Sequence, residues 1–242
     1  MPAFHTAVSR RAVLVSGVAV SLAAVSAPVS ARNLLQPSDL SGRLTDEQGR
    51  PLRNARIDVA GVSAKDGKVL WKSEWPGKTA VIPTPIFKDG HVYITSGYGV
   101  GCKLVKIGAD NQTSDVYFNQ NMVNHHGGVI LVGDRLYGHS DKGGWTCQDF
   151  LTGEVKWTSN NLKKGAIHCA DGMFYCLEEG SGTVALVEVS DKGWNEKGRF
   201  KLTPQTEQRN PKGKVWTHPV VSDGKLYLRD QELLFCFDVK GK

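Results

Sequence analysis

The chain has 242 residues, of which 40% are hydrophobic and 22% are charged, and 27 of them are glycines. This balance excludes an intrinsically disordered chain and fits one ordinary globular domain. The formal net charge of +6 comes from 30 basic and 24 acidic residues that are interspersed, without the basic block that nucleic-acid binding would require. No apolar run approaches the ~18 residues that a membrane-spanning helix needs.

An export signal is predicted at the N-terminus. Arg10 and Arg11 precede a stretch of apolar and small residues from 12 to 27, and small residues at 29–31 suit a signal peptidase. We expect residues 1–31 to be a signal peptide of a bacterial protein that works in the periplasm or outside the cell. Residues 9–14 resemble a twin-arginine signal, with Val13 where that motif usually has Phe, which favours the Tat route.

Residues 32–60 are expected to form a linker and a short β-hairpin. Residues 41–52 are Ser-Gly-Arg-Leu-Thr-Asp-Glu-Gln-Gly-Arg-Pro-Leu, and the next strand is predicted at residues 54–59. This segment resembles the first hairpin of carboxypeptidase-regulatory-like and intradiol dioxygenase β-sandwiches. Two strands alone do not make a stable sandwich, so the stretch is either an extra hairpin or the remnant of a fusion. The pairs of Tyr and His that hold dioxygenase iron are not found at the expected spacing.

A repeat organises residues 61–242. Four tyrosines, at positions 93, 137, 175 and 227, lie 44, 38 and 52 residues apart, the period expected of propeller blades. Each follows an Asp-Gly or Gly-Asp pair, at residues 89–90, 133–134, 171–172 and 223–224. These pairs suit the positive φ angles of a two-residue hairpin turn, so every copy predicts a strand, a tight turn and a second strand.

The strands of four four-stranded antiparallel blades follow from this pattern. First strands are predicted at 86–87, 129–132, 166–167 and 219–221, and third strands at 104–107, 145–150, 184–189 and 233–239. Fourth strands are predicted at 115–118, 154–157 and 199–202. Helical patterns are nearly absent beyond the signal. The predicted fold is therefore an all-β propeller of about four blades.

One outer strand is displaced in the sequence. Residues 68–71 match residues 154–157 closely but precede any complete blade, whereas the last repeat has no fourth strand of its own. If 68–71 pair with 233–239, the ring closes. If they do not, the blades form an open arc, which we favour because residues 41–59 resemble another fold. An arc would leave apolar faces at its ends and would dimerise, aggregate or await a missing half, whereas a closed ring would be monomeric.

The resemblance to a known repeat comes from two segments. Asp-Gly-Lys-Val-Leu-Trp at 66–71 and Thr-Gly-Glu-Val-Lys-Trp at 152–157 resemble the end of the PQQ-type, quinoprotein-like propeller repeat, and residues 147–153 resemble the stretch before it. The similarity covers residues 61–242, with sequence for about four blades where that family usually has seven or eight. We expect six aromatic residues to dock neighbouring blades: Trp71, Trp157, Tyr93, Tyr137, Tyr175 and Tyr227.

The predicted channel face carries the candidate binding residues. Alignment on the tyrosines places Thr84, Gly128, Ala166 and His218 at equivalent innermost positions, with Ile82, His126, Lys164 and Trp216 two residues earlier. We take Thr84, His126, Lys164, Trp216 and His218 as a rim that could bind an anionic or aromatic ligand. The alternative is that they cap strands. His125 and His126 point to opposite faces of a strand, so no shared metal site is expected.

The resemblance to quinoprotein-like repeats also implies a candidate cofactor, PQQ with calcium. True quinoproteins are expected to use an adjacent cysteine pair, a stacked Trp, and acid and amide ligands for calcium. No two cysteines are adjacent here, and of the six tryptophans only Trp216 falls at a channel position. The sequence also contains no Gly-x-Ser-x-Gly nucleophile elbow and no phosphate-binding loop.

Three function classes therefore remain. We favour an exported, non-catalytic propeller module that binds a protein or a small ligand at its channel face. The alternative is a PQQ-dependent alcohol or sugar dehydrogenase, or a degenerate relative of one. A third, an assembly scaffold at the outer membrane, resembles the role of related lipoprotein propellers, although no lipid-bearing cysteine follows the signal. Loops at 97–101, 141–144 and 178–182 share one face and form either a recognition surface or ordinary turns.

The five cysteines, at 102, 147, 169, 176 and 236, are an odd number without a CxxC motif, and most are expected to be buried as small apolar side chains. The predicted turn at 171–172 sets Cys169 opposite Phe174 and Cys176 opposite Ile167. The two cysteines are then diagonal neighbours, too far apart for a disulfide.

Overall fold

The computed structural model describes residues 13–16, 57–77 and 81–240, which form two compact units, Met1–Pro76 and Gly77–Lys242. The described residues include no helix long and apolar enough to cross a bilayer. In the first unit, β1 (Val13–Ser16), β2 (Ile57–Val62) and β3 (Val69–Trp75) form an antiparallel sheet in the order β1-β2-β3. The rest of the predicted signal peptide and residues 41–56 of the predicted hairpin lie outside the described residues.

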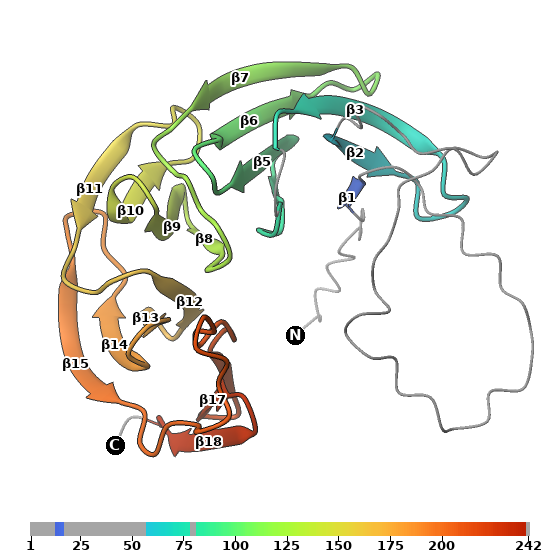
Figure 1. Cartoon of the computed structure of the whole chain (residues 1–242). Helices are drawn as coiled ribbons and strands as arrows, with labels where there is room; N and C mark the ends of the chain where they lie inside the picture. The colour runs from blue at the N-terminus through green and yellow to red at the C-terminus, as the bar shows by residue number, and fades with distance from the viewer. Residues whose placement is uncertain (1–12, 17–56, 78–80, 241–242) are drawn as a thin grey trace, which may run out of the picture. The chain divides into compact units, whose positions relative to one another are not determined.

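The second unit contains four successive antiparallel sheets, here called the first to fourth blades (Figure 1). The first blade is β4 (Ile86–Lys88), β5 (His91–Ser96), β6 (Gly101–Ile107) and β7 (Thr113–Asn119). The second is β8 (Val129–Val132), β9 (Arg135–Ser140), β10 (Gly144–Asp149) and β11 (Val155–Ser159). The third is β12 (Gly165–Ala170), β13 (Met173–Glu178), β14 (Thr183–Glu188) and β15 (Asn195–Lys201), and the fourth is β16 (Val220–Ser222), β17 (Lys225–Asp230) and β18 (Leu233–Asp238).

The predicted all-β propeller with an incomplete ring is confirmed, and its strands lie where the repeat placed them. In the described part of the chain the fourth blade has three strands, and β3 pairs with β2 rather than with β18. The face of the fourth blade that turns away from the third exposes apolar side chains, with Leu234 70% and Val220 48% exposed. Dimerisation through this face stays a prediction.

The hairpin turns explain the placement of the tyrosines. Asp89 and Gly90 have φ angles of 47° and 73°, and the Asp-Gly pairs at 171–172 and 223–224 adopt the same conformation. In the second blade the order is reversed to Gly-Asp. Gly133 has a φ angle of 58°, and the φ angle of Asp134 lies outside the left-handed region. The reversed pair therefore makes a different two-residue turn that needs glycine only at its first position.

The core of the second unit lies between the blades rather than within one sheet. Each hairpin tyrosine faces the next blade: Tyr93 packs with Leu136 and Phe150, and the Tyr137 ring lies 4.7 Å from that of Phe174. Tyr175 joins Leu226 and Leu228 of the fourth blade. Tyr227, in the last blade of the second unit, is half-buried. The same residue of each repeat thus links successive blades.

The outer strands add a second aromatic contact between blades. The Trp157 indole donates a hydrogen bond from Nε1 to the carbonyl of Ser190 in the third blade, at 2.9 Å. The Tyr117 hydroxyl donates to the carbonyl of Phe150 in the second blade, at 3.0 Å. Trp71 belongs to the first unit, where its ring covers Gly61 so closely that a side chain there would collide with it. Figure 1 shows β7, β11 and β15, which carry these positions in the second unit, along its outer side.

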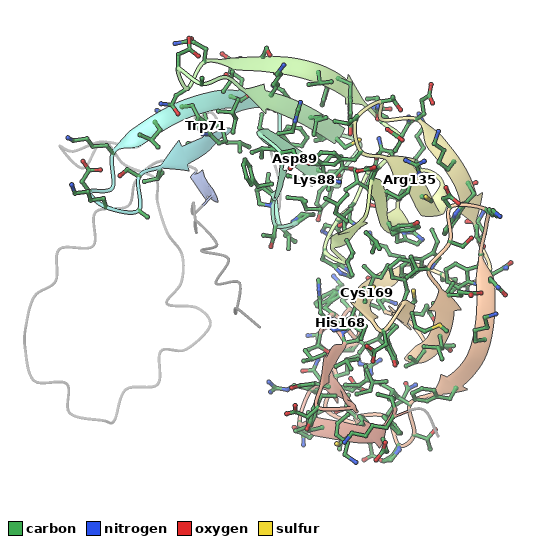
Figure 2. The ribbon with its side chains drawn as sticks, turned by 180° about the vertical axis from the view of Figure 1, so that it is seen from behind. Trp71, Lys88, Asp89, Arg135, His168 and Cys169 are labelled. Atoms are coloured by element: carbon green, nitrogen blue, oxygen red, sulfur yellow. The ribbon has the colours of Figure 1, made fainter. Side chains whose placement is uncertain are left out.

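Ion pairs join the blades at the turns. Lys88 of the first blade pairs with Asp134 and donates to the Gly133 carbonyl at 2.8 Å, both in the second blade. Arg135 pairs with Asp149 of its own blade at 2.5 Å and lies 3.7 Å from Asp191 in the third blade. Figure 2 shows Lys88 and Arg135 on neighbouring blades. Because these groups are partly exposed, each pair adds only a fraction of a kcal/mol to about 1 kcal/mol.

The predicted register of the third-blade hairpin is confirmed, since Cys169 pairs with Phe174 and Ile167 with Cys176. Cys169, labelled in Figure 2, and Cys176 are thus diagonal neighbours across β12 and β13. Diagonal Cα atoms lie about 7–8 Å apart, beyond the usual range of a disulfide. Cys176 is fully buried, which raises the pKa of its thiol well above its ordinary value and makes it unreactive.

We expect both thiols to be found free after the denatured, unreduced protein is alkylated and analysed by peptide mass spectrometry. The exposed Cys236 serves as the internal control for complete alkylation. A peptide linked through Cys169 and Cys176 would mean that the register of this hairpin is different in solution.

Candidate functional site

The first strands of the blades meet at the inner side of the second unit. β12 contacts both β8 and β16, and the amide of Ile167 donates to the carbonyl of Gly127 at 3.1 Å. A Cβ atom at Gly127 would lie 1.9 Å from the carbonyl oxygen of Gly165, so only glycine permits this approach of the two backbones. The segment that carries His125 and His126 is thereby held against the third blade.

A small pocket of about 180 Å³ opens at this convergence. Three of the five predicted rim residues, Thr84, His126 and His218, line it. Its other walls are mainly apolar and come from the first three blades: Ile82, Pro83, Gly128, Val129, Ile130 and Ile167. The alignment on the tyrosines therefore brought together residues that are 134 positions apart in the sequence, Thr84 and His218.

His126 is the central polar group of the pocket. Its Nε2–H donates to the Oε2 atom of Glu179 at 2.5 Å, and its backbone carbonyl accepts from Nε2 of His218 at 2.7 Å. The Nδ1 atom of His126 is buried and has no hydrogen-bond partner. His126 thus combines a fixed ring orientation with an unused nitrogen.

Lys164 turns toward the neighbouring loops and is not among the pocket residues. Its Nζ atom lies 2.7 Å from Asp141 Oδ1 and donates to Nδ1 of His125 at 3.2 Å. Burial and the positive charge of Lys164 lower the pKa of His125. His125 and His126 therefore have different partners, Lys164 and Glu179. They do not point to opposite faces of a strand as predicted, because they lie in a bend and their ring centroids are 5.1 Å apart.

A row of rings runs along the surface beside the pocket. The centroids of Tyr98 and His125 are 4.8 Å apart, those of His125 and His126 are 5.1 Å apart, and those of His126 and Trp216 are 6.2 Å apart. Tyr98 is 61% exposed and Trp216 is 52% exposed. We call Tyr98, His125, His126 and Trp216 the aromatic row. The two exposed ends are the kind of residues that dominate protein interfaces.

Asn124 fixes the backbone that carries the row. Its side-chain amide donates to the carbonyls of Gly128 and His139 at 2.9 and 3.0 Å, and its Oδ1 atom accepts from the amide of Gly128 at 3.1 Å. Only 1% of Asn124 is exposed. Because all of these bonds are buried, the loss of one would leave an unpaired polar group at a cost of roughly 1–3 kcal/mol.

These residues do not fit a quinone cofactor with calcium. Across the described ranges, no three His, Cys, Asp or Glu side chains are grouped as metal ligands. Trp157 is engaged in packing between blades, and Trp216 stands at the surface rather than in an enclosed chamber.

The rim prediction missed Glu179, Asp141 and Tyr98, which supply the partners of His126, Lys164 and His125. All three belong to the loops at 97–101, 141–144 and 178–182 that the sequence had placed on one face. The position of these three loops on one face was the feature of the sequence that could have indicated these partners. The specific partners depend on how far each side chain reaches between blades, which the strand pattern does not contain.

The comparisons with known proteins agree with this architecture. The family model described as the outer membrane protein assembly factor BamB matches residues 23–159, more than half of the chain. BamB from Moraxella catarrhalis is 17% identical with a TM-score of 0.52, over 77% of this chain and 56% of that one. The computationally designed Ika8 protein is 11% identical with a TM-score of 0.54, over 78% of this chain and 57% of that one. This chain spans little more than half of either structure, and no curated protein sequence matches it.

His139 lies behind the aromatic row on β9, where its ring meets the edge of Trp145 at 5.5 Å. Burial lowers its pKa from 6.5 to about 4; the smaller effects of Asp141 and Glu179 raise the pKa, and those of Lys164 and His126 lower it further. The unfolded chain therefore takes up a proton near pH 6.5 that the folded protein accepts only near pH 4. Stability contributed by the neutral ring is complete above pH 6.5 and is lost as the pH falls toward 4.

We expect His139→Phe, which keeps a ring against Trp145, to reduce this acid sensitivity. Between pH 7 and pH 4 the free energy of unfolding of the wild type should fall by about 2–3 kcal/mol more than that of the variant. Urea unfolding at the two pH values measures the difference, and groups common to both proteins cancel. Equal losses in the two proteins would show that His139 is not buried as a neutral ring.

Proposed function

The chain belongs to the family of the outer membrane protein assembly factor BamB, and from this premise we propose that it is an exported, non-catalytic propeller module that binds a protein partner. The partner is proposed to contact the inner face of the blades, along the aromatic row and the pocket beside it. The predicted signal at residues 1–31 supports export, with the Tat route as the finer proposal.

The aromatic row is the observation that carries the proposal. Tyr98 and Trp216 are more than half exposed, yet each is held against a histidine whose backbone is fixed by Asn124 and Gly127. Pre-ordered aromatic side chains lose little conformational entropy when they are buried by a partner. Exposed Ile82, which also lines the pocket, adds an apolar neighbour.

The size of the pocket favours a protein over a small ligand at this position. Its volume of about 180 Å³ is below the ~300–1,000 Å³ typical of small-molecule sites. It can accept one side chain of a docked protein between its apolar walls and the polar groups of Thr84, His126 and His218. The Lys164–Asp141 ion pair and the carboxylate of Glu179 lie on the loops beside it and present both signs of charge, which supports selection of a partner by complementarity.

Site-specific photo-crosslinking in the producing bacterium tests the proposal. Benzoylphenylalanine would replace Trp216 in one variant, Tyr98 in a second and Phe118 in a third. Phe118 is a matched control because it is 52% exposed but lies on the outer strand β7. Trp216 and Tyr98 variants should both give one discrete crosslinked protein band that the Phe118 variant lacks.

With that partner purified, Trp216→Ala should weaken binding at least about tenfold, as expected of an interface anchor. Equal crosslinking from all three positions, or none from Trp216 and Tyr98, would contradict the proposal. Dye-coupled alcohol oxidation that requires added PQQ and calcium would replace it with the dehydrogenase alternative.

A further inference from the structure

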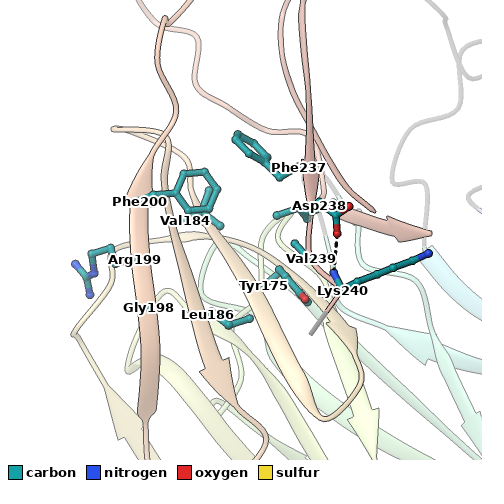
Figure 3. Close-up of a pocket in the computed structure, with 11 residues that line it drawn as sticks. Tyr175, Val184, Leu186, Gly198, Arg199, Phe200, Phe237, Asp238, Val239 and Lys240 are labelled. Carbon is teal, nitrogen blue, oxygen red and sulfur yellow. Dashed lines mark hydrogen bonds between the residues drawn. The ribbon is translucent and has the colours of Figure 1, made fainter. Parts of the chain in front are cut away.

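A second cavity, of about 400 Å³, lies between the third and fourth blades (Figure 3). Apolar side chains from both blades form most of its lining: Tyr175, Val184, Leu186, Phe200, Leu226, Phe237 and Val239. The outer strand β15 contributes Gly198, Arg199 and Phe200 to the lining, and no residue of the aromatic row lines the cavity. Its volume falls within the range of small-molecule sites.

The register of the outer strands shows why the cavity exists. Each outer strand contains one β-bulge, and the residue paired just before the bulge is Tyr117 in the first blade and Trp157 in the second. The equivalent residue of β3 in the first unit is Trp71. In the third blade it is Gly198, which pairs with Leu186. Three of the four equivalent positions thus carry an aromatic ring, and the position in the third blade, Gly198, carries none.

The space for that ring is left open. A Cβ atom at Gly198 would meet no other atom within 4 Å, and Gly198 lines the cavity. Its φ angle is outside the left-handed region, so the backbone itself does not demand glycine. Phe200, two residues further along, forms a wall with Phe237 at a ring distance of 5.0 Å, but does not fill the cavity.

The hydrogen-bond acceptors of the missing ring are retained. Trp157 donates to Ser190 and Tyr117 donates to Phe150. Within the blade repeat, the amides of Phe150, Val189 and Val239 each bond the hairpin turn of their own blade, at Asp134, Gly172 and Gly224. The equivalents of Phe150 and Ser190 in the fourth blade are therefore Val239 and Lys240, and both line the cavity.

We propose that this cavity is a binding site for a small planar aromatic molecule that carries an N–H or O–H donor, of the indole or phenol class. The ring would take the place that Trp157 and Tyr117 occupy in the other blades, between Gly198 and the apolar wall of the fourth blade. Its donor would bond a backbone carbonyl at Val239 or Lys240. The site is separate from the proposed partner surface and does not depend on it.

Titration of the ¹⁵N-labelled protein with indole tests the site. Indole should shift the amide signals of Gly198, Leu186 and Phe237 saturably, and 1-methylindole, which lacks the donor, should bind roughly three- to tenfold more weakly. Gly198→Trp should fill the cavity, abolish indole binding and raise Tm by at least about 2–4 °C. Lys201→Trp, which adds the same ring to β15 outside the cavity lining, should leave indole binding unchanged.

Absence of saturable shifts in the wild type, or equal indole binding by the wild type and Gly198→Trp, would overturn the proposal. Gly198→Leu provides a smaller filling side chain if the tryptophan variant does not fold, with the same expected loss of binding. Equal affinity for indole and 1-methylindole would overturn the assigned hydrogen bond. Binding of an aromatic peptide but not of free indole would reassign the cavity to a protein partner.

Discussion

The packing of aromatic rings between successive blades is the interaction on which the second unit depends. A single antiparallel blade has two faces and cannot bury both alone, so its stability comes from its neighbours. The hairpin tyrosine of a blade supplies one of these contacts from its second strand, and the ring on its outer strand supplies another further out. Tyr137 and Trp157 do so toward the third blade. In the fourth blade, the last of the second unit, Tyr227 is half-buried and Leu234 is exposed.

The two candidate sites follow from the same packing. Near the inner strands, blades approach so closely that Gly127 and Gly165 are in backbone contact, and the loops that connect the strands bring Glu179 and Asp141 to His126 and Lys164. Near the outer strands the blades are further apart, and a ring normally fills the gap. The substitution of glycine at position 198 therefore opens a cavity without breaking a strand, because the backbone pairing of β14 and β15 is maintained.

The repeat of Tyr with Asp-Gly turns was sufficient to predict the all-β fold, the four blades and the register of the Cys169 hairpin, because turn chemistry and strand alternation are local. It also placed Thr84, His126 and His218 around one pocket. It also placed Lys164 on the same rim, but this side chain does not line the pocket, because its Nζ atom pairs with Asp141 on a loop. The cavity at Gly198 was not predicted because a β-bulge shifts the outer strands, and alignment on the tyrosines does not register a bulge.

If the outer-strand rings hold the blades together, Trp157→Gly should destabilise the protein, because it creates in the second blade the situation found at Gly198. Trp216→Ala is the control, because Trp216 is more than half exposed and lies on the inner face. Urea unfolding should show that Trp157→Gly lowers the free energy of unfolding by about 2–4 kcal/mol, while Trp216→Ala changes it by less than about 1 kcal/mol. Equal, small changes in both variants would contradict the account.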